Sequence, residues 1–427
     1  MLETGPRAVP PQVGDAHLVP IGPGSPVVIR YPATLTDAPR REVDLVRGAV
    51  VGGSGAVNGG YFCRGVPADF AGWRIPGWSW DDVLPHFRAI ETDLDFGGPL
   101  HGEHGPIPIR RTHEFSAGTK LFVDAVLARG FRWVDDLNGG GPADGVGALP
   151  LNVRDGTRVG PGAAFLGPAL ARPNLVVHPA TRVQRVRFSG TRAVGVDALG
   201  PSGPVSYAAD RIVLCAGAIG TAHLLMVSGC GPADVLGAAG IPVLADLPVG
   251  ARFHDHPEWV LPVDWPAAAA RTPIEAALSV DGLEIRLYTA GFAQMTGEMP
   301  SDPPHIGVAL MRPTARGRLT VTSPDIAVAP VIEHHYDSVT EDVEALRRGA
   351  DLARDIAGIV DREANWSTTQ HLCGTVPLGA VLDPQCRVQG LDGLWVADGS
   401  IMPAATSRGP HATIAMIGHR AAGLVVD

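Results

Sequence analysis

The sequence RGAVVGGSGAVNGGYFCRG, residues 47–65, joins an apolar run to a glycine-rich loop of the kind that holds phosphate groups. The loop does not match the dinucleotide fingerprint G-x-G-x-x-G. Gly53 and Gly55 fit it, but Asn58 stands at the last position and Gly59 comes one residue late. It also lies about fifty residues into the chain, whereas the fingerprint normally occupies the first strand–helix turn of a nucleotide-binding fold. The segment is therefore either an ordinary glycine-rich turn or a second segment of a larger cofactor site.

The composition indicates a globular protein of two domains. Its 427 residues exceed the usual size of one domain, and 45% hydrophobic with 18% charged residues supply an ample core. A formal net charge of −10 argues against a nucleic acid or an anionic membrane surface as a partner. The five cysteines are scattered without a CxxC pair, which is typical of buried thiols in a reducing compartment.

The sequence shows no targeting or spanning segment. No apolar run approaches the ~20 residues of a membrane-spanning helix. The first residues, MLETGPRAVPPQ, lack the basic and hydrophobic regions of a signal peptide. We therefore expect a cytoplasmic protein that is not transmembrane and is at most peripheral to the inner face of the membrane.

Local patterns predict two kinds of architecture along the chain. An apolar run at 212–214, a glycine turn and a helical pattern over 219–227 predict a parallel β–α unit. Short segments rich in Val and Arg over 174–200 predict strands, beginning with NLVVHPA. Residues 257–365 alternate in polarity and include an amphipathic helix over 340–360, which predicts a more antiparallel domain. The pattern then returns to α/β at 393–403, so the first domain is discontinuous.

Three separated blocks resemble the signatures of one protein family. They are residues 47–65, residues 217–232 (GAIGTAHLLMVSGCGP), and a C-terminal set of HLCGT (371–375), WVADGSIMP (395–403) and GPHATIAM (409–416). In this order they resemble the glucose–methanol–choline (GMC) flavoprotein oxidoreductases over nearly the whole chain. The resemblance implies an α/β fold in which a Rossmann-like FAD-binding domain is joined to an α+β substrate-binding domain built on an antiparallel sheet. It places the first domain at 1–72, 160–256 and 366–427, and the second at 73–159 and 257–365.

The resemblance also implies where FAD is held. Asn58 is a candidate hydrogen-bond partner for the N5/O4 edge of the flavin, and a helix that opens near Ala412 would aim its positive end at the flavin N1–C2=O locus. The FAD contacts that it implies are Glu3 at the adenosine ribose, the loop residues Gly52, Gly53, Ser54, Asn58 and Gly59, the backbone of Val183 at the adenine, the turn residues Asp398 and Gly399, and the helix residues Ala412 and Thr413.

Glu3 stands earlier in this chain than the family pattern would place it. The acid that binds the ribose normally follows the glycine fingerprint by about 20 residues. Only Met1 and Leu2 precede Glu3, so the first strand, phosphate loop and helix are missing from this sequence. We expect a complete version to carry roughly 25–35 more residues upstream, and FAD binding to depend on them.

Two histidines are the catalytic candidates that the resemblance implies. Alcohol oxidation on a flavin needs the hydroxyl proton removed as the carbinol hydrogen leaves as hydride, and a neutral imidazole suits the first task. His371 in HLCGT matches the leading base, and His411 in GPHATIAM matches the partner that binds the substrate oxygen. The two roles could be exchanged.

Two histidine-rich patches, HDHP (254–257) and EHHYD (333–337), lack the spacing of metal ligands. We expect structural or surface roles for both patches and no bound metal.

Residues 47–65 and 407–422 look most like the family branch associated with mycofactocin, a peptide-derived redox cofactor. This resemblance implies a dehydrogenase that oxidises reduced mycofactocin and passes electrons towards respiration. One alternative is a general alcohol or choline-like dehydrogenase or oxidase of the same family. Another, of a different class, is a non-catalytic remnant or binding protein without FAD.

Overall fold

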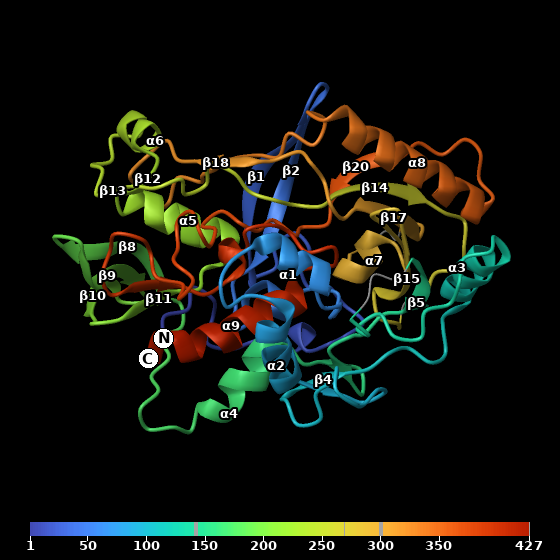
Figure 1. The fold of residues 1–427 in the computed structure, drawn as a ribbon, viewed down its shortest axis with the longest axis horizontal. Helices are drawn as coiled ribbons and strands as arrows, with labels where there is room; N and C mark the ends of the chain where they lie inside the picture. The colour runs from blue at the N-terminus through green and yellow to red at the C-terminus, as the bar shows by residue number, and fades with distance from the viewer. Residues whose placement is uncertain (141–143, 269, 299–301, 427) are drawn as a thin grey trace.

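A six-stranded antiparallel sheet forms one side of the molecule (Figure 1). The computed structural model describes residues 1–140, 144–268, 270–298 and 302–426. All neighbours in the sheet are antiparallel, which confirms the predicted antiparallel domain. In spatial order the strands are β20 (Asn365–Thr368), β14 (Pro257–Pro262), β17 (His305–Leu310), β16 (Leu283–Tyr288), β15 (Ile274–Val280) and β5 (Gly145–Ala148).

The two faces of this sheet differ in chemistry. In β16 the apolar residues Leu283, Ile285 and Leu287 pack in one cluster with Leu346 of α8 (Thr340–Ala357). Alternation along a strand sends the intervening side chains to the opposite face. That face therefore carries the charged residues of LEIRLY, and it looks away from α8 towards the rest of the molecule. Helix α3 (Ala117–Ala128) packs beside α8.

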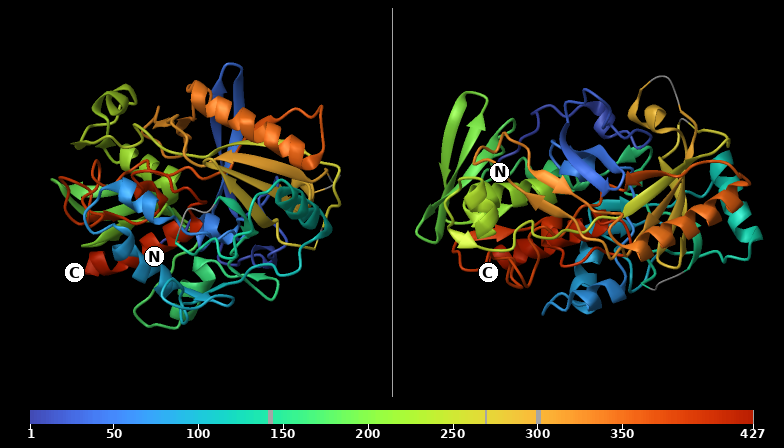
Figure 2. Two further views of the ribbon diagram at one scale, coloured as in Figure 1. Left: turned by 45° about the vertical axis from the view of Figure 1, so that its right-hand side comes forward. Right: turned by 90° about the horizontal axis from the view of Figure 1, so that it is seen from above.

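The other side of the molecule holds the parallel β–α unit that the sequence predicts. Strand β11 (Ile212–Leu214) pairs in parallel with β21 (Leu394–Val396), and α5 (Gly217–Val227) follows β11 after a short turn. A three-stranded antiparallel sheet in the order β10-β9-β8 lies nearby (Figure 2). Its strands are β8 (Arg182–Ser189), β9 (Arg192–Gly200) and β10 (Gly203–Ala208).

The expected strand over 174–180 is not formed. There Leu2 and His178 make a single parallel bridge, and the segment continues no further as a strand. Pro179 has no N–H to donate, and Ala180 has a positive φ of 49°, so extended pairing ends at this point.

A long hairpin runs from the middle of the molecule to its top edge in Figure 1. Its strands β1 (Val28–Asp37) and β2 (Arg40–Gly48) belong to a four-stranded sheet with β18 (Arg318–Thr320) and β19 (Val331–Glu333). The remaining strands form two-stranded pairs: β3 (Glu91–Asp93) with β4 (Ile107–Ile109), β6 (Val153–Arg154) with β7 (Thr157–Arg158), and β12 (Cys230–Gly231) with β13 (Ala245–Asp246).

The last helix, α9, links the end of the chain to the middle of the molecule. It spans His411–Val426 and packs along α2 (Trp80–Ile90). Helix α2 begins after Ser79, which forms a reciprocal capping box with Asp82. The other helices are α1 (Pro67–Trp73), α4 (Gly167–Ala169), α6 (Ala233–Ala238) and α7 (Phe292–Thr296).

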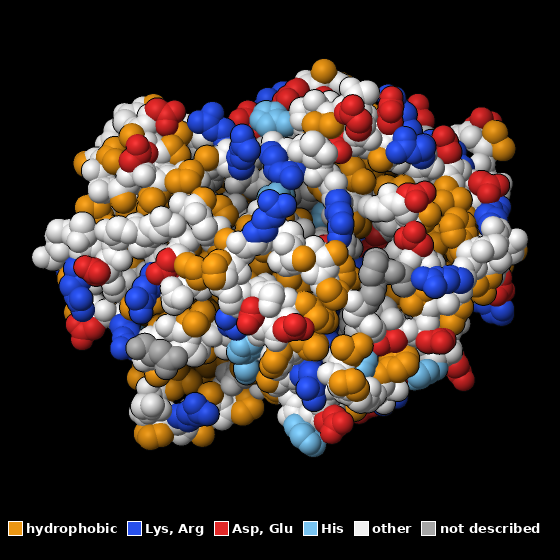
Figure 3. Space-filling view, in the orientation of Figure 1, with side chains coloured by type: hydrophobic (Ala, Val, Ile, Leu, Met, Phe, Trp, Pro, Cys, Tyr) orange, Lys and Arg blue, Asp and Glu red, His pale blue; other side chains and the backbone are white. Residues whose placement is uncertain are grey.

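The charge distribution on the surface and the state of the cysteines agree in most respects with what the composition predicts. Charged side chains of both signs are interspersed on the face in Figure 3. Within the described residues, no helix combines the length and apolar character needed to cross a bilayer. The five cysteines are free thiols, but Cys215 is exposed and so differs from the expected buried set.

Candidate active site

Two imidazole rings meet beside the polar face of the six-stranded sheet. His371 follows β20, and His256 immediately precedes β14. Their Nδ1 atoms lie 2.9 Å apart, and the rings are nearly perpendicular. Burial lowers the pKa of His256 and holds the pKa of His371 well below its usual range. Both rings are therefore neutral at physiological pH.

Asp255 fixes the backbone that carries these rings. Its carboxylate accepts hydrogen bonds from the backbone N–H groups of His256 and His371, both at 2.8 Å. It also accepts hydrogen bonds from His334 and Thr368, each at 3.1 Å. Burial would raise the pKa of Asp255, but these bonds and neighbouring positive charges outweigh it and lower the pKa to about 2. A buried carboxylate thus holds two segments that lie far apart in sequence.

The second predicted histidine, His411, is the first residue of α9. Its Nδ1 lies 3.0 Å from Nδ2 of Asn58 and 3.3 Å from the carbonyl oxygen of Tyr61. Burial lowers the pKa of His411 to about 4. Its Nε2 is buried and has no hydrogen-bond partner among the described residues. Gly55 packs against this edge, because a Cβ there would lie 2.8 Å from Nε2.

Tyr61 lies close to both predicted histidines. Its carbonyl lies at His411, and its ring lies beside Gly409, where a Cβ would come 2.9 Å from Tyr61 and 3.3 Å from Cε1 of His371. The Tyr61 hydroxyl donates a hydrogen bond of 2.7 Å to Glu284 of β16. The structure therefore gathers both predicted histidines around one tyrosine.

A charge-balanced group lies on the sheet face next to this tyrosine. Arg286 donates to Glu284 at 2.5 Å and to Glu258 at 2.7 Å. Tyr288 also donates to Glu258, at 3.0 Å. Arg408 is buried and donates to Ser279 at 2.6 Å, and its charge acts on Glu284. Two carboxylates and two guanidinium groups leave this cluster without a net charge.

The turn residues Asp398 and Gly399 lie against the start of α9 and of α5. Asp398 accepts hydrogen bonds from the N–H of Gly217 at 2.9 Å and from the hydroxyl of Thr221 at 2.6 Å. A Cβ on Gly399 would lie 2.8 Å from Ile414 in the first turn of α9. Ala412 and Thr413 are buried in the same turn. The four residues predicted from the C-terminal motifs therefore share one small region.

The glycine-rich loop runs from this region towards the chain start. Gly52 and Gly53 have positive φ values of 94° and 56°, and the loop forms a 3-10 turn over Gly53–Ala56. Ser54 is exposed, and its hydroxyl accepts a hydrogen bond of 3.1 Å from Gly48 N–H. Gly59 packs loosely against Pro273.

Glu3 lies close to Val183, near the start of the glycine-rich loop. The Glu3 carbonyl accepts a hydrogen bond of 2.8 Å from the N–H of Thr181, two residues before Val183. The Glu3 carboxylate accepts a hydrogen bond of 2.7 Å from Gly5 N–H. A Cβ on Gly5 would lie 2.2 Å from the carbonyl oxygen of Ala49, so the first residues abut the start of the glycine-rich loop.

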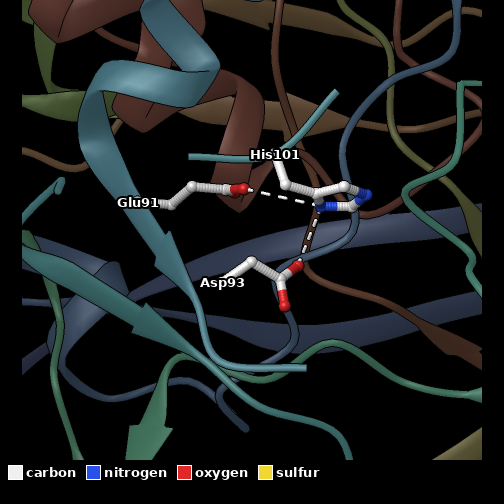
Figure 4. A group of neighbouring side chains, drawn as sticks. All are labelled: Glu91, Asp93 and His101. Atoms are coloured by element: carbon white, nitrogen blue, oxygen red, sulfur yellow. Dashed lines mark hydrogen bonds and ion pairs between the residues drawn. The ribbon is translucent and has the colours of Figure 1, made fainter. Parts of the chain in front are cut away.

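A separate group of Glu91, Asp93 and His101 resembles a metal site at first sight (Figure 4). Arg64 bonds to Glu91, and Arg111 bonds to Asp93 at 2.7 Å. Both ring nitrogens of His101 are occupied, Nδ1 by Asp93 at 3.0 Å and Nε2 by Asp136 at 2.9 Å. Burial would lower the pKa of His101, but these two carboxylates outweigh it and raise the pKa to about 9. The group is therefore an ion-pair network around an imidazolium ion, because a metal would need a deprotonated ring nitrogen.

The sequence patterns missed three residues of this site. Asp255 and His256 lie in HDHP, which we expected to have a structural or surface role, and Tyr61 lies in the loop segment. Their contacts with His371 and His411 join residues separated by up to 350 positions. A histidine directly after an aspartate, just before a strand, was the one available signal.

Comparison with known proteins identifies the family of this chain. The model for the N-terminal part of GMC oxidoreductases matches residues 27–258, and the model for the C-terminal part matches residues 313–418. An uncharacterized GMC-type oxidoreductase of Rhodococcus erythropolis is 40% identical over 451 aligned positions, which cover 98% of this chain and 90% of that protein. The oxygen-dependent choline dehydrogenase of Brucella melitensis is 30% identical, over 90% of this chain and 83% of that protein.

A solved structure gives the same result for the fold. The crystal structure of pyridoxine 4-oxidase from Mesorbium loti superposes with a TM-score of 0.90 at 28% identity, over 99% of this chain and 93% of that one. The chain therefore belongs to the GMC oxidoreductase family, whose members are FAD-dependent oxidoreductases that act on alcohol-type donors.

Proposed function

We propose that this enzyme oxidises a CH–OH group with His371 as the base and His411 as the hydrogen-bond donor to the substrate oxygen. The observation that carries the proposal is the pair of neutral imidazoles around Tyr61: among the described residues the Nε2 of each ring has no hydrogen-bond partner, and the two Nδ1 atoms have different neighbours.

His411 has the hydrogen-bond pattern of a donor. The Asn58 carbonyl oxygen accepts from Gly60 N–H at 2.9 Å, so its amide NH₂ points at His411 Nδ1 and donates to it. The Tyr61 carbonyl lies farther from the same nitrogen, at 3.3 Å, than the Asn58 amide at 3.0 Å. A neutral imidazole that accepts at Nδ1 from the nearer group carries its proton on Nε2. The unpartnered Nε2 of His411 is then an N–H group that can bind an oxygen on which negative charge develops.

His371 has the features of a base. Its Nδ1 is engaged by His256, and its Nε2 makes no hydrogen bond to any residue that the structure describes. The ring is only partly buried, so Nε2 can meet a ligand. A neutral, oriented imidazole is the group that accepts a hydroxyl proton most readily near neutral pH.

The surrounding residues fit an FAD molecule held along the line from Glu3 to α9. A Cβ on Gly53 or Gly217 would meet no atom within 4 Å, so open space lies over both glycines. Two buried atoms, Ser400 Oγ and His411 Nε2, have no hydrogen-bond partner among the residues that the structure describes. Asn58, the Gly52–Gly53 turn and the first turn of α9 would hold the ring end, and Glu3 with the Val183 backbone the adenosine end.

The chemistry then divides between the cofactor and the protein. FAD, when bound, supplies the acceptor for the hydride that leaves the carbinol carbon. His371 Nε2 takes the hydroxyl proton, and His411 Nε2–H stabilises the oxygen as the C–O bond becomes a carbonyl. The N-terminal end of α9 favours negative charge at its first turn.

The first test is single-turnover reduction of bound flavin without oxygen, followed as loss of absorbance near ~450 nm. His371→Ala should slow reduction by roughly 10²–10⁴-fold. His411→Ala should slow it by roughly 10²–10³-fold, because it removes one donor to the developing charge. His104→Ala, at an exposed histidine, is the matched control. Near-normal reduction in both active-site variants would overturn the assignment.

For the substrate, we propose reduced mycofactocin, with electrons passed on towards respiration. The resemblance of residues 47–65 and 407–422 to the family branch associated with mycofactocin supports this choice. The expected result is faster flavin reduction by reduced mycofactocin than by small alcohols, followed by reoxidation with a quinone analogue. Equal or better rates with small alcohols would move the assignment to a general alcohol dehydrogenase.

A choline-like activity is the second candidate, because choline dehydrogenases are among the relatives. A quaternary ammonium ion needs a carboxylate or aromatic face that is free to receive it. Glu258 and Glu284 are both bonded to Arg286, so the charge-balanced cluster offers no free negative charge. We therefore expect choline to be a poorer substrate than an uncharged alcohol of similar size.

A further inference from the structure

Arg408 uses little of its hydrogen-bonding capacity, although it is buried. Its side chain belongs to a residue that is 6% exposed, and it donates one hydrogen bond, of 2.6 Å, to the hydroxyl of Ser279. Within the described residues it makes no ion pair, and its Nε is buried without a hydrogen-bond partner. A guanidinium group has five N–H donors in a fixed fork. Most of the donors of Arg408 therefore meet no protein acceptor in the part of the chain that the structure describes.

The other buried arginines of the described residues are much better paired. Each bonds to a carboxylate or to several carbonyl oxygens: Arg64 to Glu91, Arg111 to Asp93 and Asp136, Arg286 to Glu258 and Glu284, and Arg158 to the carbonyls of Val13, Asp15, Leu18 and Ala56. A buried cation without such partners is costly, because nothing replaces the water that it loses. The shortage at Arg408 therefore indicates that a ligand supplies the missing acceptor.

The guanidinium group of Arg408 lies beside the candidate active site. Its partner Ser279 in β15 is the direct register partner of Glu284 in β16, so both side chains point to the same face of the sheet. The Tyr61 hydroxyl bonds to this Glu284 at 2.7 Å. Along the chain, Arg408 directly precedes Gly409, which abuts the Tyr61 ring. A substrate held by the two histidines around Tyr61 would therefore have Arg408 next to it.

The charge around Arg408 indicates which kind of acceptor fits. Glu258 and Glu284 balance the charges of Arg286 and Arg408, so the cluster has no net charge. A substrate carboxylate would add an excess negative charge close to two buried carboxylates. A carbonyl oxygen accepts hydrogen bonds from N–H groups and adds no charge. A neutral acceptor therefore fits this cluster better than an anion.

We propose that Arg408 is a specificity-determining residue that binds a neutral carbonyl oxygen of the substrate. The substrate class is then an alcohol that also carries an amide, ester or ketone group. Its carbinol is held at His371 and His411, and its second oxygen is held at Arg408. This inference rests on the proposed function and deepens it, because it concerns the substrate of the same site. The proposed mycofactocin substrate is peptide-derived, and amide carbonyls are typical of such molecules.

A series of matched alcohols tests the preference. The probes are hydroxy amides in which one, two or three carbons separate the carbonyl from the carbinol, each with the hydroxy carboxylate and the plain alcohol of the same length. Single-turnover flavin reduction in FAD-loaded protein gives kcat/KM, and calorimetry gives a dissociation constant that does not depend on turnover. Wild type should prefer at least one amide to its matched carboxylate and plain alcohol. No amide preference by either measurement would overturn the proposal.

Arg408→Met removes the donors and keeps much of the side-chain volume. The ratio of amide to plain alcohol should fall by roughly 10–100-fold relative to wild type, as expected for the loss of hydrogen bonds from a charged donor. Because the same two probes are compared in both proteins, their intrinsic reactivities cancel. An unchanged ratio at every spacing would contradict the proposal. A carboxylate preference in wild type that Arg408→Met loses would show that Arg408 binds an anion and would overturn the neutral acceptor.

Ser279→Ala is the matched control for a purely structural role. It removes the protein partner of Arg408 and leaves the guanidinium donors in place, so the amide preference should persist. Arg408→Lys keeps one charged donor group and should recover part of the preference. Urea unfolding checks that the variants fold. Equal loss of preference in Ser279→Ala and Arg408→Met would assign Arg408 to holding the sheet and overturn the inference.

The charge of the cluster provides a second readout that a structural role would not change. Arg408→Met leaves two carboxylates against the single guanidinium of Arg286. Oxidation of choline relative to an uncharged alcohol should therefore rise above the wild-type ratio, because a cation is attracted to the excess negative charge. A ratio that stays at the wild-type value would contradict the charge balance from which the neutral acceptor is inferred.

The outcomes distinguish this inference from the proposed function. If His371→Ala keeps its rate of flavin reduction, the base assignment fails, whatever substrate the enzyme prefers. If His371→Ala is slow but Arg408→Met keeps the amide preference, the base assignment survives and the role of Arg408 alone is overturned.

Discussion

At the scale of single residues, a glycine separates two rings of the candidate site. Gly409 lies where a side chain would meet Tyr61 on one side and His371 on the other. Its φ is not in the left-handed region, so the restriction comes from space and not from backbone conformation. The short distances leave room for a hydrogen atom only.

Gly409→Ala should therefore damage activity more than folding. Its Cβ would lie 2.9 Å from the Tyr61 ring and 3.3 Å from His371 Cε1, so one ring must shift. We expect a loss of about 1–3 kcal/mol of unfolding free energy, typical of overpacking, and slower flavin reduction because His371 is displaced.

Gly418→Ala in α9 is the matched control for Gly409→Ala. A Cβ at Gly418 would meet no atom within 4 Å, and alanine favours a helix by about 1 kcal/mol. That variant should gain stability and keep its rate. Urea unfolding and single-turnover reduction measure both effects, and a Gly409→Ala enzyme with the wild-type rate would contradict the prediction.

The histidines of the candidate site differ in how far the sequence indicates them. His371 and His411 could be proposed from the sequence because each lies in a short motif that resembles a family signature. His256 could not, since it is brought to the site by one contact to a residue 115 positions away. Such a contact depends on the fold, and sequence spacing does not encode it.

At the scale of elements, most predictions came from local periodicity. The helix expected over 340–360 appears as α8, Thr340–Ala357. The expected strand at 174–180 failed because Pro179 and Ala180 interrupt pairing. The ion-pair network around His101 could not be foreseen, because it joins side chains from five separate segments between Arg64 and Asp136.

This network should make stability fall at alkaline pH. The pKa of His101 is raised to about 9 in the folded protein, against about 6.5 for a free histidine. Its contribution is fully present below pH 6.5, and it is lost as pH rises through 9. The slope from this group should reach about 1.4 kcal/mol per pH unit.

Urea unfolding between pH 6 and 10 tests this prediction. His101→Gln should be less stable than wild type at pH 6.5, and its alkaline slope should be smaller. Equal slopes in the two proteins would show that the imidazolium is not the charged centre of the network.

At the scale of the whole molecule, buried neutral histidines set the acid side of the stability curve. Burial lowers the pKa of His223 and of His254 to about 4. For such groups stability is present above the unfolded pKa of about 6.5 and is lost as pH falls towards 4. Asp255, with its pKa lowered to about 2, adds a further loss below about pH 3.8. Together with His101, these shifts place maximum stability near pH 6.5.

His223 offers the sharpest test of this acid limb because it lies away from the proposed chemistry. It is 3% exposed in α5, and its Nε2 has no partner among the described residues. His223→Leu should therefore lose less unfolding free energy than wild type between pH 6.5 and 5, by up to about 1.4 kcal/mol per pH unit. His104→Leu, at an exposed position, should keep the wild-type slope. If His223→Leu follows the wild-type curve, His223 is not neutral in the folded protein, and the acid limb must come from His254 and the carboxylates.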